Sequence, residues 1–289
     1  MSHARPPVTV TLDFPVPPDI PLWRAALHRG AGIAPGQSIP PLLARAARIP
    51  GDAEAYRRVC GFAAADPLPP TWPAVAARGL QLAVMTAASF PLPVLGIVHV
   101  RQQIRWTRPL AADEPLAACC RVEGHRVVRG GGEFDLHTDV TAGAEVVWSA
   151  VTTILSRAIP GDGVRRPRPE LPIFVPTRTA TWTLPADHGR TYAAVSGDWN
   201  PIHVHPLTAR MFGFRRPIMH GWWLLARALA ELGDDLPRAG SLDVRFFAPV
   251  ALPGAVSFAA GPDEDGTVIV LQAPETCVVG WVRPLVGPG

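Results

Sequence analysis

The chain has 289 residues, of which 48% are hydrophobic and 18% charged, so its composition is that of a globular protein with ample apolar side chains for a core. Its net charge is +3 and, apart from a short arginine cluster at 165–168, its charges are dispersed, which argues against nucleic-acid binding through a concentrated basic face. No run of about 18 uncharged apolar residues and no signal-peptide pattern is visible. We therefore expect a cytoplasmic protein without a membrane partner, whose four cysteines are reduced thiols.

The first half reads as one helix followed by four strands. The helix is expected near residues 74–88, and the β-branched, alternating segments that follow predict strands at 97–107, 115–127, 133–140 and 145–156. The glycines at 130–132 are expected to form a hairpin turn between two strands, because nothing around them resembles a phosphate-binding loop.

A Pro-, Gly- and Arg-rich segment separates the two halves, which is typical of a crossing between domains. The predicted domains are therefore 1–157 and 177–289, joined by a linker at 158–176. The second half begins with a strand at 177–184 and a loop-rich stretch up to Pro217. A largely apolar helix at 221–232 follows, and then strands at 241–250, 255–260, 267–272 and 277–282. One buried helix with an antiparallel sheet is an α+β layer architecture.

The two halves resemble each other. The segment 56–61, Tyr-Arg-Arg-Val-Cys-Gly, matches the segment 192–197, Tyr-Ala-Ala-Val-Ser-Gly, at an offset of 192 − 56 = 136. Further on, Gly96, Val100 and Arg101 match Gly240, Val244 and Arg245 at an offset of 240 − 96 = 144. The order and steady offset predict an internal duplication with eight extra residues in the second copy.

Those extra residues bring polar groups together. The loop that starts at Gly197 contains Asp198, Asn200, His203 and His205, whereas the matching positions 62–67 of the first copy lack this set. One carboxylate, one carboxamide and two imidazoles suit acid–base chemistry. An Asp-x-Asn-Pro sequence is also common in turns, where its side chains bond the local backbone.

With these residues in view, the segment 192–203, Tyr-Ala-Ala-Val-Ser-Gly-Asp-Trp-Asn-Pro-Ile-His, followed by 212–221, Phe-Gly-Phe-Arg-Arg-Pro-Ile-Met-His-Gly, resembles the MaoC-like, or hydratase 2, dehydratases. The resemblance implies a double hotdog, in which each half is a long helix wrapped by an antiparallel sheet and the first half is degenerate. It also implies a lyase that interconverts (R)-3-hydroxyacyl and trans-2-enoyl thioesters carried on coenzyme A or acyl carrier protein. The two hotdogs would pair within one chain, and a homodimer of such chains is a further expectation.

Carried over to this sequence, the resemblance makes Asp198 and His203 the catalytic pair, Asn200 their support, and the backbone N–H of Gly221 the oxyanion donor. Dehydration needs a base, a proton source for the departing oxygen and a donor for enolate charge. The start of a buried helix offers such a free N–H. We also assign a substrate-binding role to Ser196 and His220, and a phosphate-binding role to arginines near the mouth of the site, Arg210, Arg215 and Arg216.

Several alternatives stand beside this interpretation. Asn200, Ser196 and His220 could be structural, and the three arginines could form a solvated surface. The spacing of His203, His205 and His220 does not match a set of three zinc ligands with an open position, so no metal is expected. No redox cofactor is expected either. His99, His125 and His137 lie on predicted strands and are expected to be ordinary. The competing functions are a hotdog acyl-thioesterase and a catalytically silent acyl-binding or scaffold protein.

Overall fold

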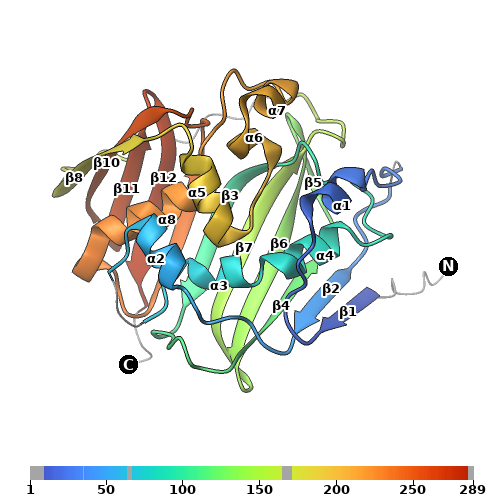
Figure 1. The fold of residues 1–289 in the computed structure, drawn as a ribbon, viewed down its shortest axis with the longest axis horizontal. Coiled ribbons are helices and arrows are strands. Elements are labelled where there is room, and N and C mark those ends of the chain that lie inside the picture. Colours follow the sequence, from blue (N-terminus) through green and yellow to red (C-terminus); the bar gives the residue numbers. More distant parts are fainter. Residues whose placement is uncertain (1–9, 35, 64–66, 165–170, 286–289) are drawn as a thin grey trace. The chain divides into compact units, whose positions relative to one another are not determined.

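The computed structural model describes residues 10–34, 36–63, 67–164 and 171–285 (Figure 1). The arginine cluster at 165–168 and residues 64–66 of the first copy lie outside these ranges. The chain forms two compact units: unit 1 comprises Met1–Pro50, Ala77–Val98 and Pro115–Pro167, and unit 2 comprises Gly51–Ala76, His99–Glu114 and Arg168–Gly289. Two segments of the first half thus belong to the unit that carries the second half. The domain boundaries at 157 and 177 stay a prediction of the sequence.

Unit 1 is a sheet with one main helix against it. The sheet order is β1-β2-β4-β6-β7, with β5 beside β6, and every pairing is antiparallel except that of β1 with β2. The strands alternate buried and partly buried residues, as expected where one face covers a core. The helix α4 contacts β2 and β4. The elements are β1 (Val10–Phe14), α1 (Leu22–Leu27), β2 (Leu42–Ala46), α4 (Arg78–Met85), β4 (Leu116–Val122), β5 (Arg126–Val128), β6 (Gly131–Ala142) and β7 (Glu145–Ser156).

Unit 2 is an antiparallel sheet in the order β3-β9-β12-β11-β10-β8, with α8 packed against it. On α8, Trp223 meets Trp182 of β8 edge-on at 5.9 Å between ring centroids, and the Trp182 indole N–H donates to Glu231. Figure 1 shows α8, in orange, crossing these strands. The elements are α2 (Glu54–Cys60), α3 (Trp72–Ala76), β3 (Val98–Trp106), β8 (Arg178–Leu184), α5 (His188–Ser196), α6 (Pro201–Val204), α7 (Pro206–Met211), α8 (Gly221–Leu232), the 3₁₀ turn η1 (Gly233–Asp235), β9 (Gly240–Phe246), β10 (Gly254–Asp263), β11 (Gly266–Gln272) and β12 (Thr276–Pro284).

The predicted α+β class is confirmed, since each unit packs a helix on a mainly antiparallel sheet, as the hotdog expectation requires. The helix at 221–232 and the strand at 145–156 have the predicted bounds, and glycines 130–132 lie at the β5–β6 hairpin. Four predictions need correction. The helix near 74–88 is two helices separated at Ala77, the strand at 115–127 is two strands, and the strand at 241–250 ends at Phe246. The stretch expected to be loop-rich before Pro217 contains α5, α6 and α7.

Positions that match in the duplication have matching local structure. Both α2 and α5 end at a glycine in the left-handed conformation, Gly61 with φ 81° and Gly197 with φ 70°. Within unit 2, Tyr56 of α2 lies 6.1 Å from Tyr192 of α5 between ring centroids. The strands β3 and β9 pair so that Arg101 lies opposite Arg245, its own counterpart in the repeat. An antiparallel pair that crosses at two equivalent residues has local two-fold symmetry there. Among the described residues, no helix is both long and apolar enough to span a bilayer.

Candidate active site

The loop after α5 is built to place Asp198. Gly197 reverses the chain, its N–H donating to the Ala193 carbonyl at 2.8 Å. The Asp198 N–H then donates to the Ser196 hydroxyl oxygen at 3.2 Å, and the Asn200 N–H donates to Oδ1 of Asp198 at 3.2 Å. These bonds hold the Asp198 carboxylate on a short turn whose backbone leads directly into α6.

His203 lies in α6, buried to 9% exposure. Its Nδ1 is 2.8 Å from the Ile218 carbonyl oxygen. Because a carbonyl oxygen can only accept, Nδ1 carries the proton, and in the neutral ring Nε2 is left with a lone pair. Burial lowers the pKa of His203, against the opposing effects of the Asp198 charge and the bond to Ile218. His203 is therefore a neutral base with one nitrogen available.

His220 precedes α8 and packs directly on His203, with 3.7 Å between ring centroids and an interplanar angle of 28°. It is 2% exposed, and its Nε2 donates to the Asp198 carbonyl oxygen at 2.9 Å. Burial lowers the pKa of His220 to about 3, so the ring is neutral, and its buried Nδ1 has no hydrogen-bond partner among the described residues. This position favours a role in holding the loop and the His203 ring over the predicted contact with substrate.

Ser196 and Asn200 also hold the loop. The Ser196 hydroxyl donates to the Tyr192 carbonyl at 2.9 Å while accepting from Asp198, and the side chain is 6% exposed. The Asn200 side chain accepts from the Ile202 N–H at the start of α6, which is the ordinary N-cap interaction before a proline at the first helical position. The structural interpretations of both residues fit these bonds. Their predicted roles in binding and catalysis stay predictions.

Gly221 is the first residue of α8, where the first N–H groups of a helix lack partners within the helix. A Cβ built on it would lie 2.9 Å from Cε1 of Phe246, closer than such contacts occur. A side chain here would therefore require the Phe246 ring to move, whereas the φ of Gly221 is not in the left-handed region. Its N–H lies at the positive end of a twelve-residue helix, which suits a developing oxyanion.

The three predicted phosphate ligands are exposed. Arg210 lies in the last turn of α7, and Arg215 and Arg216 follow that helix. Arg216 donates to the Pro253 carbonyl at 3.2 Å. No carboxylate occurs in the sequence between Asp198 and Glu231, so the permanent charges of this segment are all positive. A solvated surface and a phosphate site both fit these positions.

Asp198, His203 and His220 each offer a ligand atom, and the three atoms lie within 4.8 Å of one another. The predicted zinc alternative paired His203 with His205 and His220 instead, but His205 is exposed and caps α7 through its Nδ1. In the observed cluster the two imidazoles are stacked, so their in-plane lone pairs run side by side and do not converge on one ion. Tetrahedral zinc requires convergent ligands, and the geometry fits acid–base chemistry better.

Sequence reasoning missed His99. It lies on β3 but belongs to unit 2, where it packs 4.6 Å from Phe246 and 5.9 Å from Trp222 between ring centroids. Burial lowers its pKa to about 4, and the charge of Asp198 is close enough to oppose that shift. No local motif marks this residue, because only the pairing of β3 with β9 brings it to the site.

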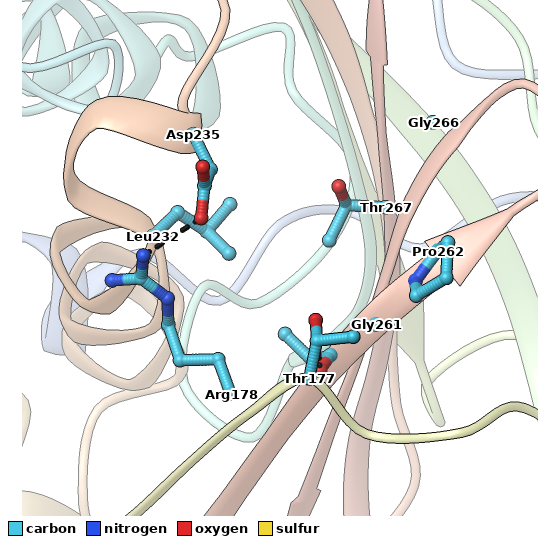
Figure 2. A pocket seen from close by; sticks show the side chains of 9 residues that line it. Thr177, Arg178, Leu232, Asp235, Gly261, Pro262, Gly266 and Thr267 are labelled. Carbon is cyan, nitrogen blue, oxygen red and sulfur yellow. Dashed lines mark hydrogen bonds and ion pairs between the residues drawn. The ribbon is translucent and has the colours of Figure 1, made fainter.

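A separate surface pocket of about 440 Å³ lies where β8 begins, beside the end of α8 and the β10–β11 hairpin. Figure 2 shows Arg178 paired with Asp235 on one wall and Thr267 and Pro262 on the other. Arg178 also donates to the Glu231 carbonyl at 2.6 Å, so its guanidinium binds a backbone carbonyl in the last turn of α8. None of the predicted site residues lines this pocket.

The chain is similar to a known protein family and to several named proteins. A family model described as "MaoC like domain" matches residues 168–264. The 3-hydroxyacyl-thioester dehydratase X of Mycobacterium tuberculosis is 32% identical over 224 residues, which cover 77% of this chain and 80% of that protein. An (R)-specific enoyl-CoA hydratase of Aeromonas caviae is 43% identical over 51 residues, which are 18% of this chain and 38% of that protein.

Among solved structures, the crystal structure of HtdX from Mycobacterium tuberculosis is similar to this one with a TM-score of 0.74 and 29% identity. The match covers 84% of this chain and 100% of that chain.

Proposed function

This chain belongs to the family of MaoC-like dehydratases, and on that premise we propose that it is a hydro-lyase that hydrates trans-2-enoyl thioesters and dehydrates (R)-3-hydroxyacyl thioesters. The relatives named above carry this chemistry in their names. The observation that carries the proposal is a neutral His203 of fixed tautomer beside the Asp198 carboxylate, in the same unit as the free helix N-terminus at Gly221.

The chemistry can be written with these groups alone. In hydration, Asp198 and His203 hold a water and accept its proton while its oxygen bonds to C3. The electron pair of the C2=C3 bond moves toward the thioester oxygen, where the Gly221 N–H binds the enolate charge. The enolate then collapses as C2 takes a proton back from the pair, so one water has been added, and dehydration is the reverse. Because only protons and water move, the proposal requires neither a metal nor a redox cofactor.

The carrier is the second part of the proposal. Coenzyme A and the arm of acyl carrier protein both bring phosphate groups, which guanidinium groups bind well. The exposed Arg210, Arg215 and Arg216 lie on the segment between α6, which holds His203, and α8, which begins at Gly221. We place the carrier phosphates on this surface, and comparing enoyl-CoA with enoyl-acyl carrier protein as substrates distinguishes the two carriers.

We also propose a cytoplasmic location and an internal pseudo-dimer, with further homodimerisation between chains. Free thiols at all four cysteines, Cys60, Cys119, Cys120 and Cys277, suit a reducing compartment. The pairing of the repeat-equivalent strands β3 and β9 supports an internal two-fold arrangement.

The test follows loss of the conjugated absorbance of crotonyl-CoA and, in parallel, release of free thiol. We expect hydration without thiol release, and a loss of about a hundredfold or more in Asp198→Asn and in His203→Ala, because each removes a group that moves or holds a proton. His125→Ala, distant in sequence and in unit 1, serves as the control. Thiol release would identify a thioesterase, absence of both reactions a binding protein, and full activity in both variants would refute the site.

A further inference from the structure

The surface beside Gly221 is aromatic. Phe246, at the end of β9, lies against the Gly221 backbone so closely that a Cβ on Gly221 would be 2.9, 3.2 and 3.4 Å from three atoms of its ring. Trp222 follows Gly221 in α8, and both aromatic residues are only partly buried. Any group bound at the Gly221 N–H therefore lies close to the Phe246 ring.

His99 completes this surface from another part of the chain. Its ring packs against Phe246 at 4.6 Å and near Trp222 at 5.9 Å. Its orientation is fixed, because Nε2 is 3.1 Å from the Arg101 carbonyl oxygen and 3.1 Å from Oε1 of Gln102, a residue with 0% exposure. Since a carbonyl oxygen only accepts, Nε2 carries the proton and the ring is held as a donor to the backbone of its own strand.

We propose that His99, Phe246 and Trp222 form an aromatic wall beside the oxyanion donor, and that His99 determines which acyl groups the site accepts. This inference rests on the proposed function, because it takes the acyl thioester as the ligand. A flat trans-2-enoyl group bound at the Gly221 N–H lies in reach of a flat aromatic surface, which favours planar conjugated groups. The size of the residue at position 99 then sets how much room remains for the rest of the acyl chain.

The selectivity follows from the way the wall is supported. His99 packs against Phe246, and Phe246 in turn packs against Gly221. Removing the His99 ring leaves space next to Phe246 without touching Asp198, His203 or the Gly221 N–H. The expected change is therefore in the relative use of short and long or branched chains, whereas the chemistry at C2 and C3 stays the same.

The experiment measures kcat/KM for crotonyl-CoA and for 2-decenoyl-CoA in five proteins, the wild type and four variants. We expect His99→Ala to raise the ratio of the long to the short substrate by about tenfold or more, since a hydrophobic pocket discriminates one methylene by about ten- to 200-fold. His99→Trp should lower the same ratio, and His99→Phe, which keeps a ring, should leave the ranking of substrates unchanged. His137→Ala is the matched control, a partly buried strand histidine in unit 1.

Binding of saturated acyl-CoAs of the two lengths, measured by calorimetry, gives a readout that needs no turnover. If the wild-type protein hydrates no enoyl-CoA but His99→Ala still shifts the binding preference, the proposed reaction is refuted and the proposed role of the aromatic wall is supported. If hydration is normal and both ratios stay within about twofold of wild type in His99→Ala and His99→Trp, the wall is refuted. If the alanine variant does not fold, the phenylalanine and tryptophan variants decide the question, because both keep a ring at this position.

Discussion

Replacing His220 by leucine tests whether a buried, uncharged histidine positions the catalytic pair. In the structure the His220 Nε2 donates to the Asp198 carbonyl oxygen at 2.9 Å, and its ring packs on His203 at 3.7 Å between centroids. Leucine fills much of the same volume but cannot donate. The Asp198 carbonyl would then face an apolar side chain, and the loop that carries the Asp198 carboxylate would lose its link to the start of α8.

The size of the effect follows from the group left unsatisfied. A buried acceptor that loses its partner costs about 1–3 kcal/mol. If that cost appears in the transition state, the rate falls by about fivefold to 150-fold, since each 1.36 kcal/mol is a factor of ten. The loss should appear mainly in kcat, because His220 is 2% exposed and is not placed to bind the carrier.

Glutamine at the same position is the matched control. The amide nitrogen of glutamine lies about as far along the side chain as Nε2 of histidine, so His220→Gln can still donate to the Asp198 carbonyl. The assay is the initial rate of crotonyl-CoA hydration, with a thermal melt of each variant to establish folding. We expect the glutamine variant to recover most of the activity lost in the leucine variant. Equal activity of two folded variants, whether high or low, would refute the positioning role.

Three further predictions concern protonation and space. Because burial lowers the pKa of His203, kcat/KM should stay level as pH falls through the ordinary histidine value of about 6.5 and should decline only below it. A decline centred above pH 6.5 would contradict the conclusion that His203 is a neutral base. Burial lowers the pKa of His99 to about 4 and of His220 to about 3, so at mildly acidic pH the unfolded chain binds protons that the folded chain does not bind. The free energy of unfolding should therefore be highest above about pH 6.5 and fall as pH falls toward these values. Calorimetric melting from pH 7 to 4 measures this loss, and His220→Gln should make it smaller. Gly221→Ala should lower kcat/KM by about tenfold or more, because the added Cβ would lie 2.9 Å from the Phe246 ring. Adding Phe246→Leu to this variant should restore part of the lost activity. Full activity of Gly221→Ala alone would show that the backbone there tolerates the contact.

The sequence predicts those elements whose signal is local. The helix at 221–232 and the strand at 145–156 have their predicted bounds because a largely apolar or β-branched run is enclosed by turn residues. The sequence predicts a loop-rich stretch between the strand at 177–184 and Pro217. In fact Pro201 and Pro206 stand at the first position of α6 and α7, where proline is favoured, so the same residues start helices.

In the candidate site, too, the sequence predicts the residues that share one local motif but not those that contact the site from elsewhere in the chain. Asp198, His203 and Gly221 could be proposed from one stretch of sequence, because the motif, the loop and the helix start are contiguous. His220 was found in that stretch too, but its role depends on a hydrogen bond to the Asp198 backbone that no pattern encodes. His99 could not be found, because its contacts with Phe246 and Trp222 join segments that lie far apart in the sequence.

The register of β3 on β9 also relates the two copies to each other. Arg101 and Arg245 are equivalent in the duplication and lie opposite each other, and Arg101 forms an ion pair with Asp243, the counterpart of His99 at the offset of 144. At a local two-fold axis, each copy presents the same strand to its partner. A strand that lies beside the partner's helix start can therefore contact that site although its own copy lacks the acid–base groups. His99 is the residue of the first copy that contacts Phe246 and Trp222 beside Gly221. Because His99 is not one of the groups proposed to move protons, we expect its substitution to alter substrate preference before it alters the chemistry.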